Sequence, residues 1–198
     1  MTRIISGFAG SLSLVVPPSG TRPTSDRVRE AIFSALQARD VIAGARVLDL
    51  YAGTGALGLE AASRGASHVT LVDKGSSAAA ACRKNAAVVK KAAPRGTKVE
   101  IEVSGASVQS YLDSPKQPFD LVFLDPPYQL TEAELLANLE SLVHRLSEDA
   151  VVLLERSSRD PEPEWPADLT LDKRKDYGDT ALYWLSPTEH DDAVVTAE

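Results

Sequence analysis

Apolar and polar residues follow one another along this chain in two kinds of pattern. Short apolar runs rich in β-branched or aromatic residues predict buried strands, whereas apolar residues three or four positions apart predict helices that pack by one face. The predicted strands cover residues 46–51, 68–73, 98–103, 119–124 and 150–155, and the predicted helices cover 26–38, 57–64, 77–92, 106–112 and 132–146. Strands that alternate with helices favour a parallel sheet with right-handed crossovers.

The two ends of the chain depart from this alternation. Residues 3–6 and 12–16 are β-prone and predict a small hairpin, which with the first helix would form an N-terminal extension over residues 1–40. Residues 169–174 and 180–185 predict a closing antiparallel hairpin. We therefore expect an α/β domain over residues 41–186 with a mainly parallel, seven-stranded, Rossmann-like sheet, and a disordered acidic tail over 187–198.

Length and composition narrow the class of protein. A chain of 198 residues with 43% hydrophobic content can bury one sizeable core. The single Cys82 excludes an internal disulfide framework, and the three histidines lack metal-ligand spacing, so we expect no metal. No apolar run is long enough to span a bilayer, and the N-terminus lacks the layout of a signal peptide. We expect a cytoplasmic protein.

Charge is unevenly distributed along the chain. The formal net charge of −7 argues against a nucleic-acid partner, but residues 1–46 hold six arginines against three acidic residues. This basic front predicts a weak electrostatic footprint for a nucleic acid. A surface helix that carries solvated arginines is the alternative interpretation.

A glycine-rich loop follows the first strand of the predicted sheet. Gly53, Gly55 and Gly58 have the dinucleotide-binding spacing, and Asp73 ends the next strand, where its carboxylate could accept hydrogen bonds from ribose hydroxyls. The pattern predicts a ligand that contains adenosine. Asp49 would repel phosphates but could accept from the amino group of a methionine-like moiety, although a strand-end aspartate can also cap the following turn.

The fourth predicted strand runs directly into Asp125-Pro126-Pro127-Tyr128. The two prolines end the strand because neither can donate to a sheet ladder. Asp125 offers a carboxylate, Pro126 a carbonyl and Tyr128 a flat ring, and this combination suits a planar base with an exocyclic amine. An ordinary proline turn with a loop aspartate is the alternative.

Together, the two strand ends resemble the class I, S-adenosylmethionine-dependent methyltransferases that carry an Asp/Asn-Pro-Pro-aromatic motif. A finer resemblance, to the RsmD-type bacterial 16S rRNA guanine-N2 methyltransferases, rests on Arg3–Gly7, Thr21–Phe33 and Lys175–Thr180. It covers residues 3–185 and implies S-adenosylmethionine as the cofactor. It also implies 16S rRNA as the substrate. Because the chain is only weakly basic, we expect a small-subunit particle to supply part of the recognition, and we expect the enzyme to be a monomer. The cofactor contacts that we expect are Asp49, Tyr51, Ala52, Gly53, Thr54, Gly55, Asp73, Lys74, Ala106 and Asp125.

The same resemblance implies a role for the basic front in binding RNA. The expected RNA contacts are Arg3, Arg22, Thr24, Arg27 and Arg29. The alternatives are closure of the cofactor site by the last four of these residues, or helix capping and solvated charge. The chain departs from the family pattern at residues 9–14, which contain no basic residue. Where the family has an acidic or amide residue after the third strand, this chain has Ser104-Gly105-Ala106-Ser107, so backbone groups around Ala106 are the expected contacts to adenine.

The expected catalytic residues are Asp125, Pro126, Pro127 and Tyr128. Tyr128 would stack on an extruded guanine while Asp125 and the Pro126 carbonyl accept the two N–H bonds of its amine.

Three other functions remain open. A DNA or RNA adenine-N6 methyltransferase would use the same tetrapeptide. A NAD-dependent oxidoreductase would use the same glycine spacing but gives Asp125 to Tyr128 no role. A non-catalytic S-adenosylmethionine-binding protein would keep the glycine loop and tolerate change at Asp125.

Overall fold

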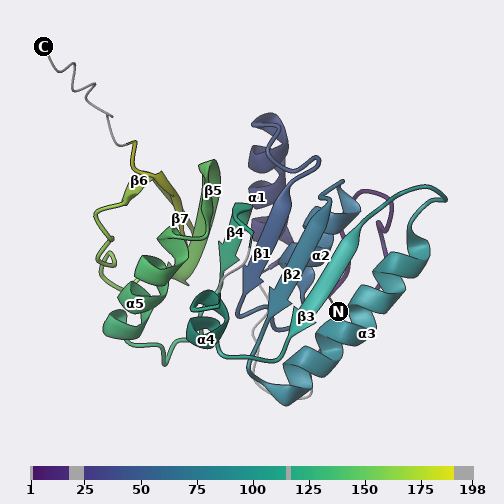
Figure 1. Ribbon diagram of the computed structural model, residues 1–198, viewed down its shortest axis with the longest axis horizontal. Coiled ribbons are helices and arrows are strands. Elements are labelled where there is room, and N and C mark those ends of the chain that lie inside the picture. Colours follow the sequence, from purple (N-terminus) through teal and green to yellow (C-terminus); the bar gives the residue numbers. More distant parts are fainter. Residues whose placement is uncertain (1, 18–24, 115–116, 190–198) are drawn as a thin grey trace, which may run out of the picture.

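Seven strands form one mixed sheet in the computed structural model, which describes residues 2–17, 25–114 and 117–189 (Figure 1). The strand order is β3-β2-β1-β4-β5-β7-β6. The first five strands in this order are parallel, and β7 pairs antiparallel with both β5 and β6. The predicted Rossmann-like sheet with its C-terminal hairpin is therefore confirmed. The strands are β1 Arg46–Leu50, β2 His68–Val72, β3 Glu100–Ser104, β4 Phe119–Leu124, β5 Leu146–Ser157, β6 Leu169–Tyr177 and β7 Thr180–Pro187.

Helices cover both faces of the sheet (Figure 1). One face packs against α1, α2 and α3, and the other packs against α4 and α5. Successive residues of a strand point to opposite faces, so Val47 of β1 joins the first core and Leu48 joins the second. The helices are α1 Asp26–Ala38, α2 Ala56–Ser63, α3 Ser76–Ala92, α4 Val108–Leu112 and α5 Glu132–Val143. Among these helices, none is both long and apolar enough to cross a membrane.

The strand β5 is longer than the sequence predicts, and α5 is correspondingly shorter. The predicted helix 132–146 ends at Val143, because Leu146 already pairs with Phe119 of β4 as the first residue of β5. A register shift between Phe119 and Leu121 separates this early contact from the regular pairing further on. Pairing to β4 thus overrides the helical period at the end of α5.

The N-terminal segment, residues 2–17, docks on α2 and forms a short hairpin. Its single antiparallel bridge, Arg3 to Ser13, is flanked by hydrogen bonds from the N–H groups of Ile4 and Leu14 to the carbonyls of Leu12 and Thr2. The Glu60 carboxylate accepts from the backbone N–H groups of Ile5 and Ser6, at 2.6 and 3.0 Å. These two N–H groups, which a longer hairpin would have used in its own hydrogen bonds, are therefore satisfied by a side chain of α2. Ile4 and Leu14 belong to the same core cluster as α2.

The C-terminal tail differs slightly from its predicted boundaries. Pro187 still belongs to β7, and Thr188 donates its backbone N–H to the carbonyl of Asp168. The predicted tail therefore begins after residue 188, and residues 190–198 lie outside the described part of the chain.

Candidate active site

The predicted site residues lie at one edge of the sheet. The glycine loop follows β1, Asp73 follows β2, Ala106 follows β3 and Asp125 follows β4. These four strands are parallel, so their carboxyl ends meet at the same edge. The strands β1 and β4 are neighbours, and Asp125 donates its backbone N–H to the carbonyl of Leu50, the last residue of β1, at 3.4 Å. The structure thus brings the two sequence motifs side by side.

The glycine loop turns by means of left-handed backbone conformations. Tyr51, Gly53 and Gly55 have φ values of 61°, 57° and 76°. Gly55 is also the N-cap of α2. Gly58 is needed for a different reason: a Cβ there would lie 2.5 Å from Cδ2 of Leu71, because α2 packs directly on β2. The predicted glycine spacing therefore serves both the sharp turn and the close approach of helix and sheet.

Two buried or half-buried carboxylates brace this loop. Asp73 accepts from the backbone N–H groups of Gly53, at 2.9 Å, and Gly75, at 2.8 Å, one on each oxygen. Asp49, near the end of β1, accepts from the N–H of Gly58 in the first turn of α2 at 2.8 Å. Each oxygen of a carboxylate can accept more than one hydrogen bond, so Asp73 keeps capacity for a ligand hydroxyl.

The pKa of Asp49 is raised from its ordinary value of 3.8 to about 7. Removal of the carboxylate from water is the main cause, and the negative charge of Asp73 adds to it, while the hydrogen bond from Gly58 acts in the opposite direction. Asp49 therefore holds a proton in the folded protein at a pH where the unfolded chain has already lost it.

Stability should consequently decrease as the pH rises from about 4 to about 7, because the folded state binds the Asp49 proton more tightly over this range. Asp49→Asn removes this dependence and keeps an oxygen for the N–H of Gly58. Between pH 5 and pH 8 we expect the variant to gain on the order of 2 to 3 kcal/mol over the wild type, because only the part of the shift above pH 5 falls within this range. Urea unfolding at the two pH values measures this difference, and parallel pH profiles of the two proteins would contradict it.

Two buried asparagines that the sequence analysis did not single out hold the loop from outside. Asn138 of α5 donates to the Tyr51 hydroxyl at 2.7 Å. Asn85 of α3 donates to the Thr54 carbonyl at 2.9 Å and also pairs with both backbone groups of Val15. Each asparagine lies on the buried face of its helix among apolar residues, and this is the signal by which the sequence could have identified it.

The Asp125 to Tyr128 segment presents an exposed ring at the end of β4. Asp125 is half-buried and Pro126 is buried, whereas Tyr128 is 71% exposed. A hydrogen bond of 2.9 Å from the N–H of Leu130 to the Pro127 carbonyl closes the turn, and Thr131 then caps α5. A large aromatic side chain left this open to solvent is available to stack on a flat ligand.

The predicted RNA contacts differ in how far they are exposed to solvent. Arg29 was expected to bind RNA, and the structure contradicts this: its side chain is 1% exposed and donates to the Arg3 carbonyl and to Asp26. Arg29 ties α1 to the N-terminal segment because it lies on the buried face of α1. Arg3 and Arg27 are exposed. Arg22 and Thr24 lie outside the described residues.

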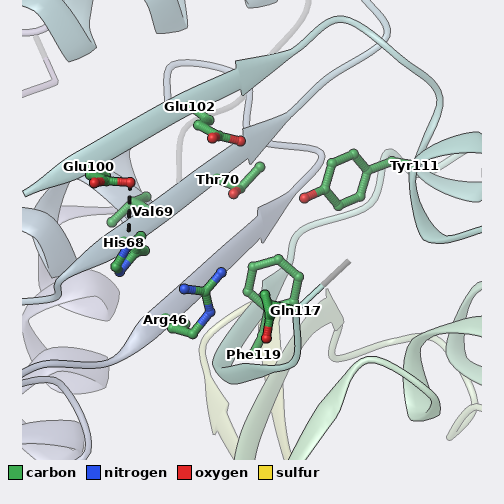
Figure 2. Close-up of a pocket in the computed structure, with 9 residues that line it drawn as sticks. All are labelled: Arg46, His68, Val69, Thr70, Glu100, Glu102, Tyr111, Gln117 and Phe119. Atoms are coloured by element: carbon green, nitrogen blue, oxygen red, sulfur yellow. Dashed lines mark ion pairs between the residues drawn. The ribbon is translucent and has the colours of Figure 1, made fainter. Parts of the chain in front are cut away.

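One enclosed hollow in the described part of the chain lies away from this site. It is lined by the first residues of four strands, at the amino edge of the sheet (Figure 2). Its volume is about 60 Å³. Cofactor pockets commonly measure about 300 Å³ or more, so this hollow does not suit such a ligand. Among the described residues, no group of three or more His, Cys, Asp or Glu side chains is arranged to hold a metal ion.

Two known proteins of the same name are similar to this chain in sequence. The chain is 36% identical to ribosomal RNA small subunit methyltransferase D of Escherichia coli over 90% of its length and 86% of that protein. It is 35% identical to the protein of the same name from Haemophilus influenzae over 89% of each chain. Both relatives are matched over most of their own length.

Solved structures show the same fold. The E. coli protein yhhF, provisionally described as a methyltransferase, superposes with a TM-score of 0.80 at 32% identity, over 94% of this chain and 97% of that one. The magnesium protoporphyrin IX methyltransferase of Synechocystis, solved with bound S-adenosylmethionine, shares the fold with a TM-score of 0.62 at 14% identity, over 85% of this chain and 87% of that one.

The family model described as conserved hypothetical protein 95 matches residues 2–186. This match spans the N-terminal segment, the glycine loop and the Asp125 to Tyr128 motif. Together with the matched relatives, it shows that this chain belongs to the conserved hypothetical protein 95 family, which comprises the RsmD-type, S-adenosylmethionine-dependent methyltransferases.

Proposed function

We propose that this protein transfers a methyl group to the exocyclic N2 amine of a guanine in 16S rRNA, acting as a cytoplasmic monomer on a small-subunit particle. The observation that carries the proposal is the position of Asp125-Pro126-Pro127-Tyr128 directly beside the glycine loop, joined to it through the hydrogen bond from Asp125 to Leu50. The names of the relatives support rRNA of the small subunit as the substrate. The choice of guanine N2 rests on the family resemblance.

The residues at the carboxyl edge fit S-adenosylmethionine, which supplies a methyl group activated by a sulfonium. Asp73 has acceptor capacity left for ribose hydroxyls. Asp49, near the end of β1, would accept from the methionine amino group in its ionised form, which a nearby ammonium favours over the protonated form. The half-buried Ala106 would lie beside adenine. The other proposed contacts are Tyr51, Ala52, Gly53, Thr54, Gly55, Lys74 and Asp125.

Positioning is the main task of the enzyme in this reaction. The lone pair of a guanine amine is delocalised into the ring, so the amine is a weak nucleophile. Tyr128 would stack on the extruded base, and Asp125 with the Pro126 carbonyl would accept the two N–H bonds and aim the lone pair at the methyl carbon. These hydrogen bonds strengthen as the nitrogen becomes positive, so they stabilise the transition state more than the bound substrate. One N–H proton is then lost, to Asp125 or to water.

Small ribosomal particles from cells that lack the modification provide the direct test. We expect the protein and S-adenosylmethionine to convert one guanosine of 16S rRNA to N2-methylguanosine, as measured by nucleoside mass spectrometry after digestion. N6-methyladenosine as the product would contradict the choice of base and favour the adenine-methylating alternative. Transfer to naked 16S rRNA but not to particles would contradict the choice of particle.

A further inference from the structure

The helix α3 and the loop after it carry the strongest uninterrupted positive charge in the chain. Between Asp73 and Glu100 the sequence contains seven basic residues and no acidic residue, although the whole chain has a net charge of −7. Six of the seven lie on α3 or in the loop between α3 and β3, and all six are exposed; we call them the α3 basic surface. These residues are Arg83, Lys84, Lys90, Lys91, Arg95 and Lys98.

The cations of the α3 basic surface are not used to hold the fold together. Among the ion pairs that described side chains form, none involves a residue of this surface. Arginines elsewhere do pair with carboxylates: Arg3, Arg29, Arg64, Arg156, Arg159 and Arg174. Lysines in the last turn of a helix complement its dipole, which accounts for Lys90 and Lys91 but not for the other four.

The carboxylates of the neighbouring strand β3 point away from this surface. Glu100 and Glu102 belong to β3, next to α3, but they alternate with Ile101, which joins the core on the α3 side. Both glutamates therefore point to the opposite face of the sheet. Figure 2 shows them there, in the hollow that Thr70 and Tyr111 also line. The positive charge of α3 consequently faces solvent without an acidic partner beside it.

The α3 basic surface begins at the edge that holds the candidate active site. Arg83 lies beside Gly105, which follows the carboxyl end of β3: a Cβ built on that glycine would be 3.6 Å from the guanidinium. From there the exposed face of α3 continues toward the amino edge of the sheet. Lys84 and Lys91 lie seven residues apart on this face, roughly 10 Å along the helix axis. The cations thus form a track that leads away from the reaction site.

We propose that the α3 basic surface binds the phosphate backbone of the RNA that flanks the target nucleotide. This proposal rests on the RNA substrate proposed above and assigns the main electrostatic contact to α3, beyond the basic front of the chain. Exposed Lys and Arg side chains in a row suit a polyanion that is read through its charge rather than its bases. An anionic membrane is the weaker alternative, because the apolar face of α3 is buried against the sheet and only Val88 adds a large exposed apolar side chain.

The double variant Lys84→Gln/Lys91→Gln tests this assignment. Glutamine has nearly the same helix propensity as lysine, so α3 should remain intact. We expect the affinity for an unmodified 16S rRNA transcript to fall on the order of tenfold at low salt. The negative slope of log affinity against log salt should become less steep, by about 0.7 to 0.9 for each lost phosphate contact. Filter binding between 50 and 200 mM KCl measures both.

The matched control is Lys173→Gln/Lys175→Gln, which removes two exposed lysines from β6 at the other end of the sheet. An equal loss of RNA affinity in both variants would overturn the proposal, because only net charge would then matter. Unchanged RNA binding by the α3 variant would also overturn the proposal. If the wild type then binds vesicles of phosphatidylserine and the α3 variant does not, the surface binds anionic membranes instead.

Two further measurements separate this proposal from the proposed function. Calorimetric affinity for S-adenosylmethionine should be the same in the wild type and the α3 variant. If the wild type transfers methyl groups to rRNA but the α3 variant binds and methylates it equally well, the RNA-binding surface is wrong and the proposed function stands. If the wild type binds the transcript through α3 but methylates no rRNA, the proposed function is wrong.

Discussion

Asp125→Ala is expected to slow methyl transfer to rRNA by about 100- to 1000-fold, because it removes an acceptor aimed at the charge that develops on the nitrogen. The segment that follows Asp125 is closed by its own hydrogen bond and by the cap of α5, so the turn should survive the change. The measurement is single-turnover transfer of a labelled methyl group, with calorimetry of S-adenosylmethionine alongside. The loss should be in the rate of transfer much more than in cofactor affinity.

Two further variants make this result interpretable. Asp125→Asn keeps one carbonyl oxygen as an acceptor and should retain more activity than Asp125→Ala. Asp149→Ala removes an exposed carboxylate from β5 on the amino side of the sheet and should transfer as the wild type does. Transfer by Asp125→Ala at the wild-type rate would show that the amine is not held in the way proposed above.

Glu60→Ala is expected to lower the free energy of unfolding by about 3 to 5 kcal/mol, the usual cost of breaking a buried charged pair from one side. Glu60 is fully buried, and besides the N–H groups of Ile5 and Ser6 it accepts from Arg64 at 2.7 Å. The variant leaves two backbone donors and a nearly buried guanidinium without their acceptor. The melting temperature should fall by roughly 2 to 4 °C for each kcal/mol lost.

Glu140→Ala provides the control, since Glu140 is an exposed glutamate on α5 and its loss should change stability by less than about 0.5 kcal/mol. Glu60→Gln should fall between the two, because an amide can still accept an N–H but cannot neutralise Arg64. The interpretation fails if Glu60→Ala melts at the same temperature as Glu140→Ala.

The sequence predicts the sheet and the turning points of the site well, for local reasons. Runs such as residues 119–124 are apolar throughout because both faces of a central parallel strand are buried. Gly55 and Gly58 are readable because only glycine tolerates the φ and the close contact at these positions. Local chemistry thus predicts the turn of the glycine loop and the end of β4 at Asp125 to Tyr128 without any three-dimensional arrangement.

What the sequence does not reveal is mostly long-range. Glu60, Asn85 and Asn138 each lie on a buried helix face. Their hydrogen-bond partners are 55, 70 and 87 residues away along the chain, so no local pattern identifies these partners. Arg29 is a different case. It precedes Ile32 and Phe33 by three and four positions and so shares their buried face, a relation that its charge obscured. The sequence pattern does not single out the α3 cations, because they lie within an alanine-rich helix whose apolar residues dominate that pattern.

The docking of the N-terminal segment also sets an order of events during synthesis. Residues 5–15 leave the ribosome before Glu60, Ser63 and Asn85, which bind them from 54 to 70 residues later in the chain. At a translation rate of about 5 to 20 residues per second, this segment waits roughly 3 to 14 s for its partners. Native contacts of such large sequence separation form late and slow the folding of a domain. The segment that helps to fix the glycine loop is therefore made first and secured only after α2 and α3 exist.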